Sequence, residues 1–298
     1  MGHFISRHGR LILIGLPALW LLVFVFAPFL IVLRISLSTA FTGQPPFQPV
    51  IDPAAGWSGL VAFFSALHTG NFEFLATDNL YIDAYLSSLR IAAISTVIIV
   101  IVGYPLAYGI ARAPRNWRPA LVLLAILPFF TSFVIRVYSW IAILRDEGFL
   151  NHALISAGLI DEPLAIIGTN TAVYIGIVYS YLPFFILPLY ATLEKMDESL
   201  VEAARDLGAG RRRAFWLVTL PLSLPGVVAG SFLVFVPAIG EVVIPELLGG
   251  SGTLMIGKVL WTEFFSNQDW PVASAVAVVL LVTLIVPIVI FQRMLAKS

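Results

Sequence analysis

The sequence predicts an all-α membrane protein with six transmembrane helices, and three observations support this prediction. Of the 298 residues, 59% are hydrophobic and only 11% are charged. The mean hydropathy is +0.96. Soluble domains carry about 25% charged residues, so most of this chain is better suited to lipid than to water. The apolar residues also form runs of roughly 20, the length at which a helix crosses the ~30 Å hydrocarbon layer.

Six apolar runs are long enough to be spans. They are Leu11–Ser36, Tyr85–Ala111, Ala120–Leu144, Thr171–Leu193, Leu222–Leu247 and Pro271–Arg293. The first run is too long for a signal peptide and has no clear cleavage site, so we expect a retained anchor at 11–36. Prolines recur in or near the runs, which membrane helices tolerate when neighbouring helices satisfy the freed backbone groups. We therefore expect a packed bundle of kinked helices.

The basic residues gather in alternate connecting segments. One set contains Arg7, Arg10, Arg112, Arg115, Arg118, Lys195, Arg205, Arg211, Arg212, Arg213, Arg293 and Lys297. Only Arg145 and Lys258 lie near the connections on the opposite side. Because cytoplasmic loops are enriched in Lys and Arg, we expect both tails, 1–10 and 294–298, to be cytoplasmic.

Several classes of site are absent from the sequence. The net charge is zero, so no basic field indicates nucleic acid, and no cysteine is available for disulfides or thiolate metal sites. The four histidines are scattered and do not predict a metal site. Gly252–Lys258 has the spacing of a phosphate-binding loop, but Val259 stands where that motif needs Ser or Thr. The chain is therefore predicted to have no nucleotide site of its own.

The segment at 37–84 is predicted to lie outside the membrane. It is rich in Pro, Gly and aromatic residues, and its charged residues are all acidic: Asp52, Glu73, Asp78 and Asp83. A structureless loop of this length is uncommon, so we expect it to fold as a cap. Two interpretations remain open, a docking surface for an external partner and a folded lid.

The most informative segment is the polar interruption between the fourth and fifth spans. Ser199 and Glu202 have the spacing of a capping box, which predicts a short helix beginning near Leu200. Good helix formers follow, and Gly208 stands where a left-handed residue ends a helix. Arg211–Trp216 then predicts a second helix, basic and aromatic at the lipid surface. The product is a helix–glycine–helix knob on the cytoplasmic face.

This segment resembles a known motif. Glu202–Ala204, Gly208, Leu220 and Pro221 resemble the EAA loop of bacterial ATP-binding-cassette (ABC) importer permeases, with Val218 where that family usually has Ile. The resemblance implies the type I (MetI-like) permease fold, with a five-helix core at 85–293 and a coupling loop at 194–221. In that family the loop inserts into the cytoplasmic ATPase. The coupling residues implied here are Glu202, Ala203, Ala204, Asp206, Gly208, Leu220 and Pro221.

Five further segments narrow the resemblance to polyamine importers, most closely the first of two permease subunits of a putrescine transporter. They are Tyr104–Ala107, Phe133–Tyr138, Gly240–Gly250, Trp261–Phe265 and Asp269–Ala275. The resemblance implies putrescine import across a bacterial inner membrane by a translocation subunit that is not itself an enzyme. It further implies a second permease subunit, two ATPase subunits that bind ATP and Mg, and a periplasmic polyamine-binding protein. No cofactor is expected in this chain.

Polyamine recognition requires carboxylates for the ammonium groups and aromatic faces for cation–π contacts. Glu241 lies within the predicted fifth span, where a carboxylate is costly unless it is partnered or functional. Glu246 follows five residues later, about 500° of helical rotation, so the two share a face only roughly unless Pro245 breaks the helix. Candidate aromatic walls are Tyr138, Trp140, Tyr174, Tyr179 and Tyr181.

Arg136 is a further candidate for the substrate path, near the predicted outer end of the third span. It could instead extend to the outer headgroups, or form a salt bridge with Glu241 that holds the bundle together. For each aromatic residue, packing is the alternative to a place in the path.

Three alternatives to polyamine import remain. The first is an ABC permease for another small solute. The second, a stand-alone secondary transporter, would show internal repeats and an intramembrane ion relay, of which only Glu241 resembles a member. The third, a membrane enzyme, lacks a nucleophile–base pair, clustered histidines and paired intramembrane aspartates.

Overall fold

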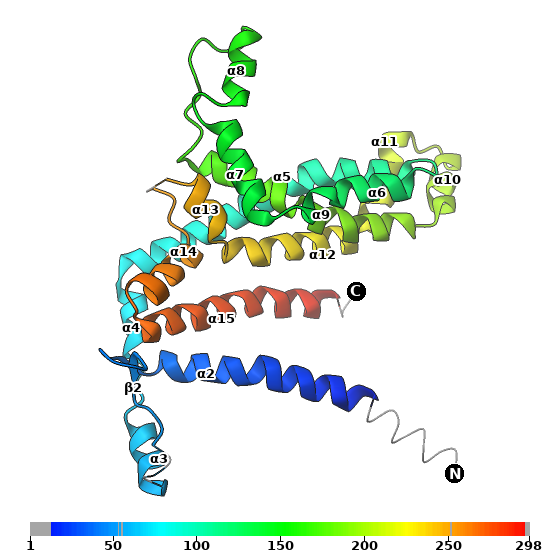
Figure 1. The fold of residues 1–298 in the computed structure, drawn as a ribbon. Helices are drawn as coiled ribbons and strands as arrows, with labels where there is room; N and C mark the ends of the chain where they lie inside the picture. The colour runs from blue at the N-terminus through cyan, green and yellow to red at the C-terminus, as the bar shows by residue number, and fades with distance from the viewer. Residues whose placement is uncertain (1–12, 53, 55, 251, 296–298) are drawn as a thin grey trace, which may run out of the picture. The chain divides into compact units, whose positions relative to one another are not determined.

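A computed structural model describes residues 13–52, 54, 56–250 and 252–295, and Figure 1 shows its helices. The predicted tail at 1–10 and the last three residues of the tail at 294–298 lie outside the described residues. The chain divides into two compact units. One comprises residues 1–82 and 260–298, and the other comprises residues 83–259. Each unit is described by itself.

The described helices agree with a polytopic membrane protein. Four of them are long and apolar enough to cross a membrane: Leu13–Ser36, Asn79–Arg112, Asn170–Glu194 and Arg211–Ile239. A bent pair, Arg118–Phe130 with Phe133–Ser156, makes a fifth span if it is counted as one. The sixth predicted span coincides with α15 (Trp270–Leu295), which holds a shorter apolar stretch at Trp270–Val286.

The third predicted span, Ala120–Leu144, is not a single rod. Its two halves meet at an angle of 88°. Thr131 and Ser132 cause the break because both have extended ψ angles, 155° and 133°. The helix therefore cannot continue through them, although the hydropathy of the segment is uninterrupted.

In the first unit, the N-terminal helix includes η1 (Leu22–Phe26) and α2 (Ala27–Ser36), and α2 packs along α15. The predicted external loop is folded. It contains β1 (Thr39–Ala40), β2 (Phe47–Gln48), α3 (Gly56–Ser65) and α4 (Gly70–Thr77). The two strands pair antiparallel, with Thr39 opposite Gln48, so the strictly all-α prediction misses one short hairpin.

Polar contacts pin this loop to the end of the first span. The Asn71 side-chain amide donates to the carbonyl oxygens of Ser36 and Ser38, each at 2.8 Å. The Arg34 guanidinium lies 4.9 Å from the centroid of the Phe63 ring. The loop is therefore an ordered part of its unit, and its role as a docking surface stays a prediction.

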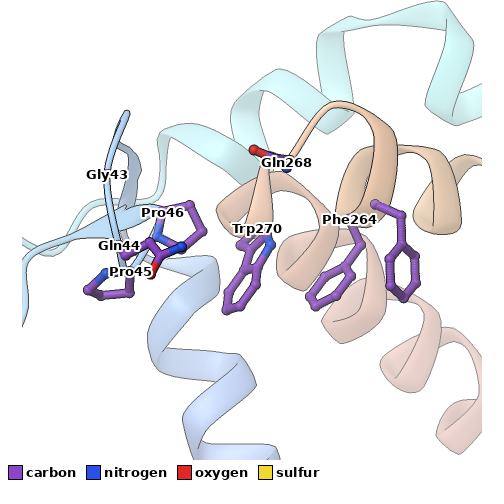
Figure 2. Close-up of a pocket in the computed structure, with 8 residues that line it drawn as sticks. Gly43, Gln44, Pro45, Pro46, Phe264, Gln268 and Trp270 are labelled. Atoms are coloured by element: carbon purple, nitrogen blue, oxygen red, sulfur yellow. The ribbon is translucent and has the colours of Figure 1, made fainter.

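The turn of the hairpin faces a row of aromatic rings from η5 (Thr262–Ser266) and the start of α15 (Figure 2). Trp270 stacks on Phe264 with centroids 4.8 Å apart and on Phe47 with centroids 6.2 Å apart. A hollow of about 410 Å³ lies here. It is lined by the uncharged residues Gly43, Gln44, Pro45, Pro46, Phe264, Phe265, Gln268 and Trp270. The nearby Glu263 carboxylate is buried and accepts hydrogen bonds from Tyr81 and Asn267, both at 2.9 Å.

The second unit is built from the remaining helices. They are most of α5 (Asn79–Arg112), α6 (Arg118–Ile126), η3 (Leu127–Phe130), α7 (Phe133–Leu144), α8 (Phe149–Ser156), α9 (Asn170–Glu194), α10 (Glu198–Asp206), α11 (Arg211–Ala214), η4 (Phe215–Thr219), α12 (Leu220–Ile239), α13 (Val243–Leu248) and most of α14 (Ile256–Trp261). The long helices α9 and α12 pack side by side (Figure 1). Phe185, Leu189 and Val234 are fully buried in the core of this unit.

Two glycines of α12 allow α9 to approach closely. A Cβ atom at Gly230 would lie 2.9 Å from the Phe185 carbonyl oxygen, and one at Gly226 would lie 3.1 Å from the Cα of Leu189. These neighbours are backbone atoms, which cannot move without shifting the helix. The pair thus resembles the small-residue contacts that bring membrane helices together.

We expect Gly230→Val to lower the melting temperature of the detergent-purified protein. Overpacking of this kind costs about 1–3 kcal/mol. Gly109→Ala is the matched control, because no atom lies within 4 Å of a Cβ there and alanine favours a helix over glycine by about 1 kcal/mol. Thermal unfolding followed by size-exclusion fluorescence measures both changes. Equal melting temperatures for the two variants would contradict this account of the α9–α12 contact.

Candidate functional site

The predicted coupling knob is present in the second unit. Its helix α10 begins after Asp197, whose carboxylate accepts the Ser199 backbone N–H at 2.9 Å. This hydrogen bond holds the pKa of Asp197 below its usual range. The prediction that Ser199 caps the helix is therefore wrong. Asp197 begins the helix two residues earlier, so Ser199 already lies inside it and supplies an N–H to the cap.

The end of α10 confirms the predicted role of Gly208. Its φ angle is +86°, in the left-handed region that glycine adopts without steric cost. The Gly208 N–H donates to the Arg205 carbonyl at 2.9 Å, and the Ala209 N–H donates to the Ala204 carbonyl at 3.0 Å. This pair of bonds is the Schellman arrangement, which satisfies two carbonyls at the helix end.

The residues predicted for coupling fall into two groups. Glu202, Ala203, Asp206 and Gly208 are exposed and Ala204 is half-buried, so they form the outer surface of the knob. The neighbouring Leu207 is 90% exposed, unusual for an apolar side chain in the absence of a partner or lipid. A shallow depression beside them is lined by Glu202, Arg205, Asp206, Gly208, Ala209, Gly210 and Arg211.

Leu220 and Pro221 form the second group, at the base of the knob. They begin α12, where Pro221 occupies the first turn, a position that tolerates a missing N–H. Leu220 packs against the buried core of the unit. They therefore fix how the knob joins the fifth span and are not part of its outer surface.

A series of three contacts runs from the knob through α5 to the start of the fifth span. Glu198, the first residue of α10, forms an ion pair with Arg112 at the end of α5, with Oε1 and Nη1 2.7 Å apart. The Arg112 guanidinium lies 5.6 Å from the centroid of the Tyr108 ring. Tyr108 in turn meets Phe215 edge to face at 5.7 Å. Phe215 opens the π-helical turn η4 that leads into α12, so the knob is linked to both α5 and α12.

Glu241 does not lie within a continuous span. The fifth span was predicted as Leu222–Leu247, but α12 ends at Ile239 and a new short helix, α13, begins at Val243. The Glu241 carboxylate explains the second start. Its Oε1 atom accepts the backbone N–H groups of the next three residues, at distances of 3.0–3.3 Å. The break thus occurs before Pro245, which lies inside α13.

The Glu241 side chain is buried, with 7% of the residue exposed. Its other oxygen, Oε2, accepts a hydrogen bond from the Tyr181 hydroxyl on α9. The sequence predicts Tyr181 only as a possible aromatic wall of the path. Its distance in sequence from Glu241 does not predict this hydrogen bond. Hydrogen-bond donors therefore hold this buried carboxylate in place. Among the described residues, the Arg136 guanidinium does not form an ion pair with it.

The alternative of a salt bridge between Arg136 and Glu241 is not found among the described residues. Arg136 is buried, and its guanidinium lies 5.7 Å from the ring centroid of Phe129 and 5.6 Å from that of Phe133. Its Nε and Nη1 atoms have no hydrogen-bond partner in the part of the chain that the structure describes. Both rings flank the bend between η3 and α7. Arg136 therefore packs inside that bend.

The other path candidates are separate from Glu241 in their contacts. Trp140 on α7 meets Tyr179 on α9 edge to face at 5.3 Å, which favours packing for this pair. Tyr138 is 56% exposed. Glu246 on α13 forms an ion pair with Lys258 on α14, with Oε2 and Nζ 2.9 Å apart. Lys258 belongs to the false phosphate-loop motif, and nothing in that motif predicts its contact with Glu246.

The comparisons with known proteins agree with this geometry. The family of binding-protein-dependent transport system inner membrane components matches residues 10–298. The chain belongs to this family. Its members are non-enzymatic translocation subunits, so the chain is a multi-pass inner-membrane permease subunit of an ABC importer.

Two curated relatives of this permease are spermidine/putrescine transport system permease proteins named PotB. The protein from Salmonella typhimurium is 37% identical over 92% of this chain and 89% of its own length. The protein from Escherichia coli is 36% identical over 92% of this chain and 93% of its own length. A chain of a bacterial ABC transporter for alginate import has the same fold, with a TM-score of 0.70, 18% identity, and coverage of 99% of this permease and 98% of that chain.

Proposed function

We propose that this permease subunit moves polyamines, with putrescine as the main substrate, from the periplasm to the cytoplasm. Similarity to the spermidine/putrescine permeases along 92% of the chain supports this substrate class. The single structural observation that carries it is the buried Glu241 carboxylate, which hydrogen-bond donors hold in place and which has no ion-pair partner among the described residues. Such a group is a fixed negative charge in a membrane helix bundle, where a carboxylate usually marks a path for cations.

The surroundings of Glu241 suit an ammonium ion. Tyr181 and the start of α13 donate hydrogen bonds to the carboxylate but supply no cationic side chain. Tyr181 also brings an aromatic ring to this carboxylate, and ammonium groups interact favourably with aromatic faces. We propose that the substrate passes Glu241 as it moves between the helices of the permease.

ATP-driven movement enters through the knob on α10 in this proposal. ATP and Mg bind in two cytoplasmic ATPase subunits, and both termini of the permease and the knob face the cytoplasm. The exposed surface around Leu207 meets the ATPase. The Glu198–Arg112 ion pair and the Tyr108–Phe215 contact then transmit its movement to α5 and α12. A second permease subunit completes the path, and a periplasmic polyamine-binding protein delivers the substrate.

The proposal is tested by reconstituting the complete importer into proteoliposomes. The partners to supply are an ATPase, a second permease and a binding protein, which are to be sought among the genes next to that of this chain. We expect ATP-dependent uptake of radiolabelled putrescine and spermidine, and no uptake with a non-hydrolysable ATP analogue. ATP-dependent uptake of a different class of solute, with none of either polyamine, would overturn the substrate and leave the importer assignment intact.

A further inference from the structure

The ion pair between Lys258 and Glu246 lies exposed on the surface of the second unit. The two side chains are 33% and 56% exposed, and their charged atoms are 2.9 Å apart. A dissolved cation can therefore reach the Glu246 carboxylate. Lys258 occupies the place beside that carboxylate in this structure.

Both helices of the pair attach to the segment that holds Glu241. Glu246 lies on α13, which begins at the Glu241 carboxylate. The first turn of α14 packs against the same segment, because a Cβ atom at Gly257 would lie 2.5 Å from the Gly240 carbonyl oxygen. The residue after Gly257 is Lys258. The ion pair thus lies next to the helix break at 240–242, where the buried Glu241 carboxylate is held.

The pair is not needed to hold either helix. The Glu241 carboxylate already satisfies the first N–H groups of α13. The Ile256 N–H at the start of α14 donates to the Ser88 hydroxyl at 2.7 Å. Exposed ion pairs also contribute little to stability. A ligand that replaces one partner would therefore leave the fold unchanged.

The chemistry of Lys258 matches one end of a diamine. Its side chain is four methylene groups that end in a primary ammonium. Putrescine has the same four methylene groups with an ammonium at each end. We propose that Lys258 is a built-in competitor that occupies Glu246 until the ammonium group of a substrate displaces it. This inference rests on the proposed polyamine function and adds a residue that sets how tightly the permease holds its substrate.

The test is equilibrium binding of radiolabelled putrescine to the complete permease–ATPase complex in lipid nanodiscs without ATP. Lys258→Met keeps the length of the side chain and removes its charge. Because an exposed ion pair is weak, we expect this variant to bind putrescine about two- to fivefold more tightly than the wild type. Lys258→Arg keeps the pair and should bind as the wild type does. The neutral analogue 1,4-butanediol should not compete in any variant.

Glu246→Gln provides the second arm of the test. It should weaken putrescine binding and remove the gain from Lys258→Met when the two substitutions are combined. Arg145→Met removes one cation at an exposed position outside the pair and should leave the affinity unchanged. Unchanged or weaker binding by Lys258→Met, in complexes that still transport putrescine, would overturn the competitor and leave the proposed function standing. If no complex, the wild type included, binds or transports putrescine, the substrate proposal itself fails.

Discussion

Gly208→Val is expected to separate ATP hydrolysis from transport. The φ angle of +86° places Gly208 in the left-handed region, where an ordinary residue is strained by roughly 1–2 kcal/mol and a β-branched residue fits worst. That strain corresponds to an approximately 5- to 30-fold smaller population of the native helix end. No atom lies within 4 Å of a Cβ at this position, so the change acts on the backbone and not on packing. The complex should therefore assemble, hydrolyse ATP and import far less substrate per ATP.

The measurement is the ratio of putrescine uptake to ATP hydrolysis in the same proteoliposomes. Gly210→Val is the matched control, because Gly210 has a φ angle of −61° and equal open space around its Cβ position. Gly208→Asn should recover part of the ratio, since Asn adopts the left-handed conformation more readily than other side chains. If Gly208→Val and Gly210→Val give the same ratio, the shape of this helix end does not control coupling.

Much of this fold follows from short-range signals in the sequence. Apolar runs of sufficient length predict membrane helices because lipid leaves the backbone no other partner for its polar groups. The glycine at 208 likewise predicts the end of α10, since only a residue free of a Cβ reaches that conformation without cost. The start of α10 is predicted less well. Ser199 fits the capping-box spacing, but Asp197 is also a good capping residue two positions earlier, and its side chain accepts the Ser199 N–H.

The candidate site depends on contacts that no local pattern contains. The sequence predicts that the Glu241 carboxylate is costly within lipid. The three backbone N–H groups that bind it and break the span belong to apolar residues, so their side chains give no sign of these hydrogen bonds. Tyr181 is 60 positions away from it in the sequence. For Arg136 the sequence leaves three interpretations open: the substrate path, the outer headgroups and a salt bridge with Glu241. The bend at Thr131–Ser132 instead places it between two aromatic rings.

Glu241→Gln is expected to reduce putrescine uptake by roughly 10- to 100-fold. This estimate follows because an interaction with a charged group is worth about 1.5–3 kcal/mol. Glutamine keeps one carbonyl oxygen for the N–H groups of Val242–Ile244, so α13 should still begin at the same place. Initial uptake rates measure the change, divided by the amount of complex recovered by size-exclusion chromatography.

Two companion variants separate substrate recognition from structure. Glu241→Ala removes the acceptor as well as the charge, so it should also lower the yield of assembled complex. Tyr181→Phe removes the hydroxyl donor but keeps the charge and the ring, so uptake should fall less than in Glu241→Gln. If Glu241→Gln imports putrescine at the wild-type rate while Glu241→Ala fails to assemble, the carboxylate serves only to start α13. The cation path would then have to be sought at Glu246 on α13, whose carboxylate side chain is 56% exposed.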